Sequence, residues 1–157
     1  MEQRGRSGRP VVDLLRERID DAQFSEGHAL RAYVRAFEGS DKRAVGFVGV
    51  GRNSVVMELA DGDILKISAR VLSDKMGTRP FEVPILERGV VEVGYHVKVY
   101  WFVQPRAQTP VTWSQYKQFR SDLEKNNYFL ELGGDRQLGV QAGQVKLLDP
   151  YAVQIID

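Results

Sequence analysis

The segment Gly49–Val56 combines residue types that suit phosphate binding. Its sequence, GVGRNSVV, places glycines between two runs rich in β-branched residues, and glycines let backbone N–H groups come close to an anion. No Gly-Lys-Ser/Thr follows, which excludes a Walker A loop. A strand pattern rather than a helix pattern follows, which excludes a dinucleotide-binding fingerprint. The alternative interpretation is an ordinary glycine turn in a hairpin.

Lys66 is the second candidate, in the apolar run Ile64-Leu65-Lys66-Ile67. A lysine on such a strand can direct its ammonium group at nucleotide phosphates. The alternative is an exposed lysine on the polar face of a strand.

Asp149 is the third candidate. It follows the apolar run Val145–Leu148 and precedes Pro150. A carboxylate on a turn after a strand is well placed to hold Mg²⁺. The alternative is an Asp-Pro turn in which the carboxylate caps local backbone.

Glycine loop, strand lysine and post-strand aspartate occur here in the order that protein kinases use. VGVGRNSVVMELADGDILKI resembles the first three strands of the protein-kinase-like fold, including its small, divergent bacterial and phage-borne members. VYWFVQP resembles the strand entering the hinge, and QLGVQAGQVKLLDPYAV resembles the segment from the catalytic-loop Asn to the metal-binding Asp. The resemblance covers residues 44–157.

This resemblance implies a site for ATP and Mg²⁺ and gives single residues a role. Gly49 and Gly51 would belong to the glycine loop, with Ser54 where a third glycine usually sits. Val56 would pack on adenine, and Lys66 would bind the α- and β-phosphates. The remaining implied positions are Gln104 in the hinge, Gln137 at the catalytic-loop Asn and Asp149 at the metal-binding Asp.

The catalytic centre departs from the kinase pattern. Leu132 stands where the catalytic Asp is expected, and no His-Arg-Asp is present. Glu131, one residue away, and Asp135, close to Gln137, are the candidates for an improvised base. The chain ends eight residues after Asp149, without an activation segment or a helical lobe. We therefore expect that catalysis has been lost.

The acidic partner of Lys66 is open between Glu82 and Glu87. Kinases place this partner on a helix, but Pro80 and Pro84 oppose a normal helix in this segment.

The elements that must position these residues follow from hydrophobic periodicity. Apolar residues at helical spacing predict helices from Pro10 to about Ala22 and from Ser25 to Glu38. Thr112 and Gln115 form a capping box that starts a third helix. The predicted strands are 45–50, 54–59, 64–67, 90–93 and 97–103, followed by a short hairpin of 137–140 and 145–148.

This order predicts an α+β fold with N-terminal helices, a five-stranded antiparallel sheet that resembles a kinase N-lobe, one further helix and a short C-terminal β-hairpin. We expect residues 1–9 to form a flexible basic tail and residues 10–157 a single domain. Within that domain we assign a helical extension, the sheet and a reduced C-lobe remnant, which are residues 10–40, 44–103 and 104–157.

Composition excludes several classes of protein. The 157 residues carry 22 Lys+Arg and 21 Asp+Glu, so the basic excess of a dedicated nucleic-acid module is missing. No cysteine and only two histidines are present, which excludes disulfides, thiolate chemistry and histidine-rich metal sites. No apolar run approaches the ~20 residues of a membrane span, and Met1–Pro10 lacks a signal-peptide core. We expect a soluble cytoplasmic protein.

Three functions remain open. The first is a catalytically impaired kinase-like module that binds a protein partner, with or without a nucleotide cleft. The second is a minimal ATP-dependent phosphotransferase that uses Lys66 and Asp149, with Glu131 or Asp135 as base. The third is a small nucleic-acid-associated protein that uses the arginine-containing tail and the aromatic strands, and its binding would weaken steeply with salt.

Overall fold

The computed structural model describes residues 8–21, 24–50, 54–130 and 137–155. The chain divides into two compact units. Unit 1 consists of Met1–Leu72 and Leu86–Gln104, and unit 2 of Ser73–Ile85 and Pro105–Asp157. The division at Gln104 lies next to the boundary predicted after residue 103, whereas nothing in the sequence predicts that Ser73–Ile85 joins the second unit.

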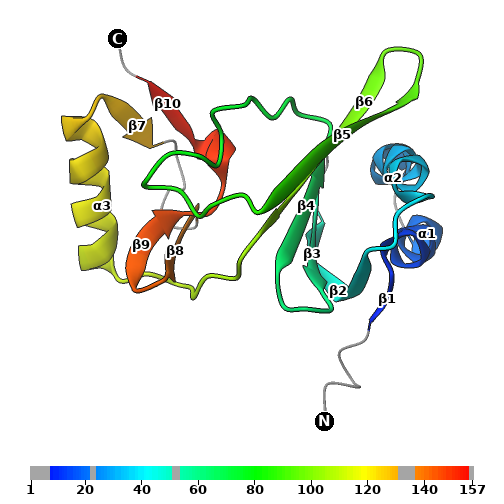
Figure 1. Ribbon diagram of the computed structural model, residues 1–157, viewed down its shortest axis with the longest axis horizontal. Helices are drawn as coiled ribbons and strands as arrows, with labels where there is room; N and C mark the ends of the chain where they lie inside the picture. The colour runs from blue at the N-terminus through cyan, green and yellow to red at the C-terminus, as the bar shows by residue number, and fades with distance from the viewer. Residues whose placement is uncertain (1–7, 22–23, 51–53, 131–136, 156–157) are drawn as a thin grey trace. The chain divides into compact units, whose positions relative to one another are not determined.

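Unit 1 is an antiparallel sheet with two helices on one face (Figure 1). Its six strands have the order β1-β2-β3-β4-β6-β5. The helices are α1 (Val11–Asp21) and α2 (Phe24–Phe37). The strands are β1 (Arg9–Pro10), β2 (Arg43–Val50), β3 (Ser54–Leu59), β4 (Ile64–Ser68), β5 (Glu87–Gly94) and β6 (Val97–Gln104).

The core of unit 1 lies between the helices and the sheet. The predicted stripe of α2 is confirmed, because all four of its members are buried: Leu30, Tyr33, Val34 and Phe37. Alternate residues of the central strands face these helices, as the two-residue period of a strand requires. Those buried strand residues are Val55, Met57, Leu65, Ile67, Val99 and Val103.

The sheet has six strands where the sequence predicts five. The additional strand is β1, in which Arg9 pairs with Ala44 and Pro10 with Arg43. Arg43 also donates a hydrogen bond from Nη2 to the carbonyl oxygen of Gly8, at 2.8 Å. The prediction was therefore wrong for Arg9, which lies in a strand rather than a tail, and helix α1 begins after Pro10. The other expected tail residues, 1–7, lie outside the described residues.

Unit 2 contains one helix and two small sheets (Figure 1). Helix α3 (Trp113–Lys125) begins as predicted, with reciprocal hydrogen bonds between Thr112 and Gln115. The predicted C-terminal hairpin is confirmed as β8 (Leu138–Gln141) and β9 (Gln144–Leu147). The second sheet, β7 (Tyr128–Leu130) paired with β10 (Val153–Ile155), was not predicted.

Taken together, the elements confirm the α+β class. Within the described ranges, no helix has the length and apolar character needed to cross a membrane.

Candidate functional site

Lys66 lies in the middle of β4 and points away from the helices. Its neighbours Leu65 and Ile67 are fully buried in the core of unit 1. Because successive side chains of a strand alternate between the two faces of a sheet, Lys66 belongs to the face opposite α1 and α2. There it is half-buried, and its Nζ lies 5.7 Å from the centre of the Phe102 ring. At this distance the ring attracts the ammonium group.

Four residues form a continuous row across this face, which we call the Lys66 row. Gly49 of β2 pairs with Val56 of β3, Val56 pairs with Lys66 of β4, and Lys66 pairs with Phe102 of β6. Directly paired residues in an antiparallel sheet have Cβ atoms about 5 Å apart on the same face. The row therefore puts an apolar surface directly beside the lysine.

The other predicted site residues of unit 1 share this face. Ser54 is two residues before Val56 and pairs with Ser68. Gln104 is two residues after Phe102, pairs with Ile64 and is only 2% exposed. Gly51 lies outside the described residues.

The backbone at Gly49 borders open space. A Cβ added there would meet no atom within 4 Å, and its φ does not require glycine. The glycine is therefore not needed for packing or for a special backbone conformation. The open space beside Gly49 borders Val56, which leaves room for a ligand at this end of the Lys66 row.

The two acidic residues considered as partners of Lys66 have other partners. Glu87 accepts a hydrogen bond from Lys42 Nζ at 2.7 Å, and Glu82 forms an ion pair with Arg79. As Pro80 and Pro84 indicate, residues 69–86 form no helix in the structure.

In unit 2, Gln137 and Asp149 lie at the same end of the β8–β9 hairpin. Leu138 pairs with Leu147 at this end, and the backbone N–H of Leu148 donates to the carbonyl oxygen of Gln137 at 2.6 Å. The backbones of these two candidates are therefore held together by the hairpin, although they are twelve positions apart in the chain.

The carboxylate of Asp149 also caps local backbone, as the alternative interpretation expects. Its Oδ1 accepts a hydrogen bond from the Tyr151 N–H at 2.9 Å. This bond fixes the carboxylate at the start of a 3₁₀ turn, Pro150–Ala152. Such a fixed carboxylate fits Mg²⁺, which proteins usually hold with one or two carboxylates, water and substrate phosphates. The described residues contain no group of three or more acidic, histidine or cysteine side chains that would hold a metal by themselves.

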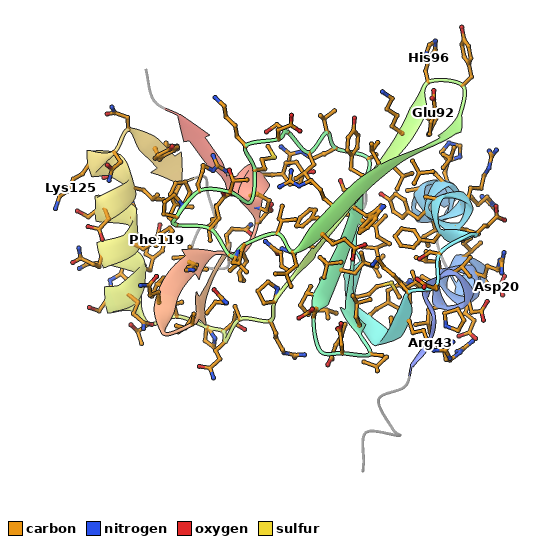
Figure 2. All side chains as sticks on the ribbon, viewed as in Figure 1. Asp20, Arg43, Glu92, His96, Phe119 and Lys125 are labelled. Atoms are coloured by element: carbon orange, nitrogen blue, oxygen red, sulfur yellow. The ribbon has the colours of Figure 1, made fainter. Side chains whose placement is uncertain are left out.

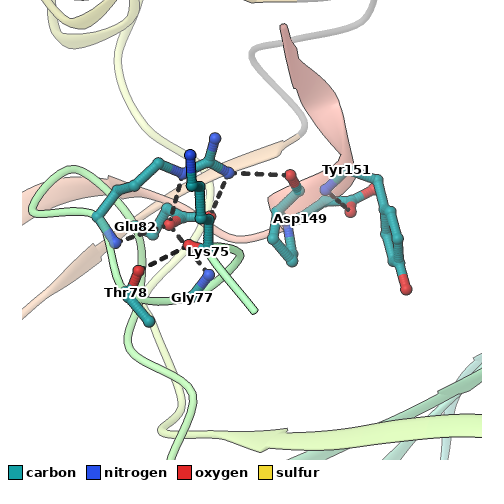
Figure 3. A network of polar contacts seen from close by, with 8 residues as sticks. Lys75, Gly77, Thr78, Glu82, Asp149 and Tyr151 are labelled. Carbon is teal, nitrogen blue, oxygen red and sulfur yellow. Dashed lines mark hydrogen bonds and ion pairs between the residues drawn. The ribbon is translucent and has the colours of Figure 1, made fainter. Parts of the chain in front are cut away.

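The buried Glu82, labelled in Figure 3, forms an ion pair with the half-buried Arg79 next to this turn. Glu82 is 2% exposed. Its carboxylate accepts hydrogen bonds from the backbone N–H groups of Gly77 and Arg79, at 3.0 and 2.9 Å, and from Nε and Nη2 of Arg79, at 2.8 and 2.7 Å. The hydrogen bond to Glu82 raises the pKa of Arg79 above its usual value.

The same pair positions the turn that follows Asp149. Arg79 Nη2 donates to the carbonyl oxygen of Pro150 at 3.2 Å. On the other side of Glu82, Val83 N–H donates to the carbonyl oxygen of Leu147 and Leu147 N–H to that of Phe81, both at 2.8 Å. We call Arg79 and Glu82, with these contacts, the Arg79–Glu82 brace. It ties the segment 77–83 to both sides of Asp149.

Sequence reasoning missed the brace. The only local signal was an arginine and a glutamate three residues apart beside Pro80, a pattern that also fits an exposed loop.

A hollow of about 500 Å³ in unit 2 was also missed. Phe119 and Leu123 of α3 line it, together with Phe81, Tyr128 and Val145. In Figure 2, Phe119 points from α3 toward the hairpin and Lys125 points away from it. The four-residue spacing of Phe119 and Leu123 in the third helix was the available signal, and both side chains are buried.

The two candidates for a catalytic base, Glu131 and Asp135, lie outside the described residues.

Comparison of the sequence with protein-family models and with curated proteins finds no match in either.

Proposed function

We propose that this chain is a kinase-like module that binds a nucleoside triphosphate with Mg²⁺ and acts through contact with a protein partner rather than through phosphoryl transfer. The observation that carries the proposal is the Lys66 row. Open glycine backbone, an apolar valine and a lysine are adjacent on the face that the helices leave free.

Three members of the Lys66 row, together with Gln104, have roles in this proposal. The ammonium group of Lys66 binds phosphate oxygens, and the backbone at Gly49 approaches the same phosphates. Val56 offers an apolar surface to the base, and the hinge position Gln104, on the same face, offers an amide. Gly49, Val56 and Lys66 lie on three consecutive strands, which is the arrangement that the kinase resemblance implies.

Within unit 2, the proposal assigns a Mg²⁺ site. Mg²⁺ would be held by Asp149 and Gln137, and it would neutralise phosphate charge. Both residues belong to one rigid feature, since the hairpin joins their backbones and the Arg79–Glu82 brace fixes the turn that follows. A metal ligand held in this way costs little ordering free energy when the ligand binds.

The sequence at the catalytic position argues against transfer. Leu132 has no group that can accept a proton from a substrate hydroxyl. Exposed aromatic side chains on unit 2 favour a role in protein contact: Trp113 is 67% exposed and Phe129 45%. Aromatic residues of this kind are enriched in the centres of protein interfaces.

The test is thermal unfolding of the protein with and without millimolar Mg·ATP. A ligand that binds only the folded state raises its stability by RT ln(1 + [L]/Kd), about 2.7 kcal/mol at one hundred times Kd. We expect a rise in Tm for the wild type and for Lys98→Ala, and its loss in Lys66→Ala. Lys98 is the matched control because it is an exposed lysine of β6 on the same face of the sheet as Lys66. An equal shift in all three proteins, or no shift in any, would contradict the proposal.

A second candidate is a minimal ATP-dependent phosphotransferase. The hairpin favours it, because it joins the backbones of Gln137 and Asp149, the positions to which the kinase resemblance gives the catalytic-loop Asn and the metal-binding Asp. In that case purified protein should release phosphate from Mg·ATP or label itself, and Asp149→Asn should abolish both reactions. Binding of ATP without either reaction would leave the binding module as the function.

A further inference from the structure

Strand β5 is an edge strand with an exposed outer side. It stands at the end of the strand order, and among the described residues no strand pairs with its outer edge. It has eight residues, from Glu87 to Gly94. In Figure 2, Glu92 and His96 mark the β5–β6 hairpin, which extends beyond α2. Such an edge presents unpaired backbone groups that can pair with another strand.

Three side chains of β5 lie on the face opposite the helices. Arg88, Val90 and Glu92 alternate with the core-facing residues, and Val90 is 53% exposed. Their partners on β6 lie on the same face: Phe102, Tyr100 and Lys98.

These three residues form a self-complementary pattern. Arg88 and Glu92 carry opposite charges at equal distances on either side of Val90. When two copies of β5 pair antiparallel around a two-fold axis at Val90, Arg88 of one copy lies opposite Glu92 of the other. Both charge pairs then form by symmetry, and Val90 lies opposite Val90. Opposite charges at directly paired positions stabilise an antiparallel pair.

We propose that β5 is a dimerisation edge and that its occupant is a second copy of this chain, paired antiparallel around Val90. The register is specific. A slip of one residue would exchange the two faces of the strand. A slip of two would place Val90 opposite a charged residue and would lose both charge pairs.

The surface beside the edge has room for another chain. A hollow of about 470 Å³ lies between α2 and β5, lined by Arg35, Glu38 and the residues Val91–Gly94. Glu38 in this lining forms an ion pair with Arg16 at 3.6 Å, so the charges that would recognise a second copy are those of Arg88 and Glu92. An unrelated peptide could use the backbone edge but would not match these charges.

The first test measures mass against concentration. Analytical ultracentrifugation from 1 to 500 μM should show a reversible dimer for the wild type. Arg88→Glu alone and Glu92→Arg alone each place like charges opposite each other twice. Each should therefore weaken dimerisation about tenfold or more. The double variant, Arg88→Glu with Glu92→Arg, restores both pairs and should restore dimerisation.

A wild type that remains monomeric over this range would overturn the proposal. So would a double variant no tighter than the single ones, provided that far-UV circular dichroism shows all four proteins folded.

The second test uses the absence of cysteine in the chain. In the proposed register, Val90→Cys lies opposite itself, within the Cα separation that a disulfide accepts. Mild oxidation should link it into a dimer, and faster than Val71→Cys, whose position is 65% exposed but away from the edge. Equal rates of cross-linking would contradict the register.

Discussion

Glu82 has a carboxylate that is almost completely buried, and it accepts four hydrogen bonds from Gly77 and Arg79. Removing one partner of a buried ion pair is far more costly than the net stability of the pair, because the other charge remains buried. We predict that Glu82→Gln lowers the free energy of unfolding by about 3–5 kcal/mol, measured by urea denaturation.

Glu124→Gln is the matched control for this prediction. Glu124 pairs with Arg120 on the surface of α3, and both side chains are about half exposed. Exposed pairs contribute about 0–1 kcal/mol. Similar losses of stability in the two variants would contradict a stabilising role for the Arg79–Glu82 brace.

Tyr33 makes the free energy of unfolding depend on pH in the alkaline range. Burial raises the pKa of its hydroxyl from 10.0 to about 12, against the opposing effect of a hydrogen bond with the Ala69 backbone. Between these values the unfolded chain loses the tyrosine proton and the folded chain keeps it. The stabilisation is therefore complete below pH 10 and is lost as the pH rises toward 12.

We predict that between pH 9 and pH 12 the wild type loses about 2 kcal/mol more stability than Tyr33→Phe. Denaturation curves across this range measure the difference. Tyr95→Phe is the control, since Tyr95 is 90% exposed at the tip of a hairpin. Parallel losses in the wild type and Tyr33→Phe would show that Tyr33 does not have this role.

Single residues differ in how far the sequence reveals them. Val56 and Lys66 each sit between apolar neighbours, so alternation alone assigns them to the face away from the core. Arg79 and Glu82 sit in a segment without periodicity. Their burial arises from strand β9, far away in the chain, and no local pattern contains that information.

At the scale of elements, α3 shows a local signal that was sufficient. Thr112 accepts a hydrogen bond from the Gln115 N–H at 3.1 Å, and Gln115 Oε1 accepts one from the Thr112 N–H at 2.7 Å. We predict that Thr112→Ala destabilises the protein by about 1 kcal/mol in urea denaturation. Ser114 is the second residue of the helix and is exposed. Ser114→Ala should change stability by less than half as much. Equal effects would contradict the capping role.

Strands β1, β7 and β10 show where local signals were insufficient. Each has only two or three residues, too few for a two-residue alternation to stand out. β1 exists because Ala44 and Arg43 lie beside it, and β7 because β10 returns to it from the end of the chain. In contrast, the hairpin at Asp61-Gly62 was predicted, because its turn residues and flanking strands are adjacent in sequence.

At the scale of the whole molecule, each of the two units carries its own set of candidate residues. Unit 1 carries Gly49, Val56 and Lys66, and unit 2 carries Gln137 and Asp149. The sequence predicted both sets, and the structure brings the members of each set together within its unit. Sequence pattern determines which residues share a sheet face or a hairpin end. It does not determine that Ser73–Ile85 leaves the sheet and packs with the second unit, since that depends on contacts distant in the chain.

We propose that the Lys66 row in unit 1 binds Mg·ATP and that Asp149 in unit 2 holds Mg²⁺. Two-dimensional ¹H–¹⁵N NMR of the protein during titration with Mg·ATP tests it most directly. We predict saturable shifts of the backbone amide resonances of residues 49–56, 66 and 104, together with shifts of the amide resonances of residues 137–149. Shifts confined to the residues that line the α3 hollow, or no shifts at millimolar Mg·ATP, would contradict it.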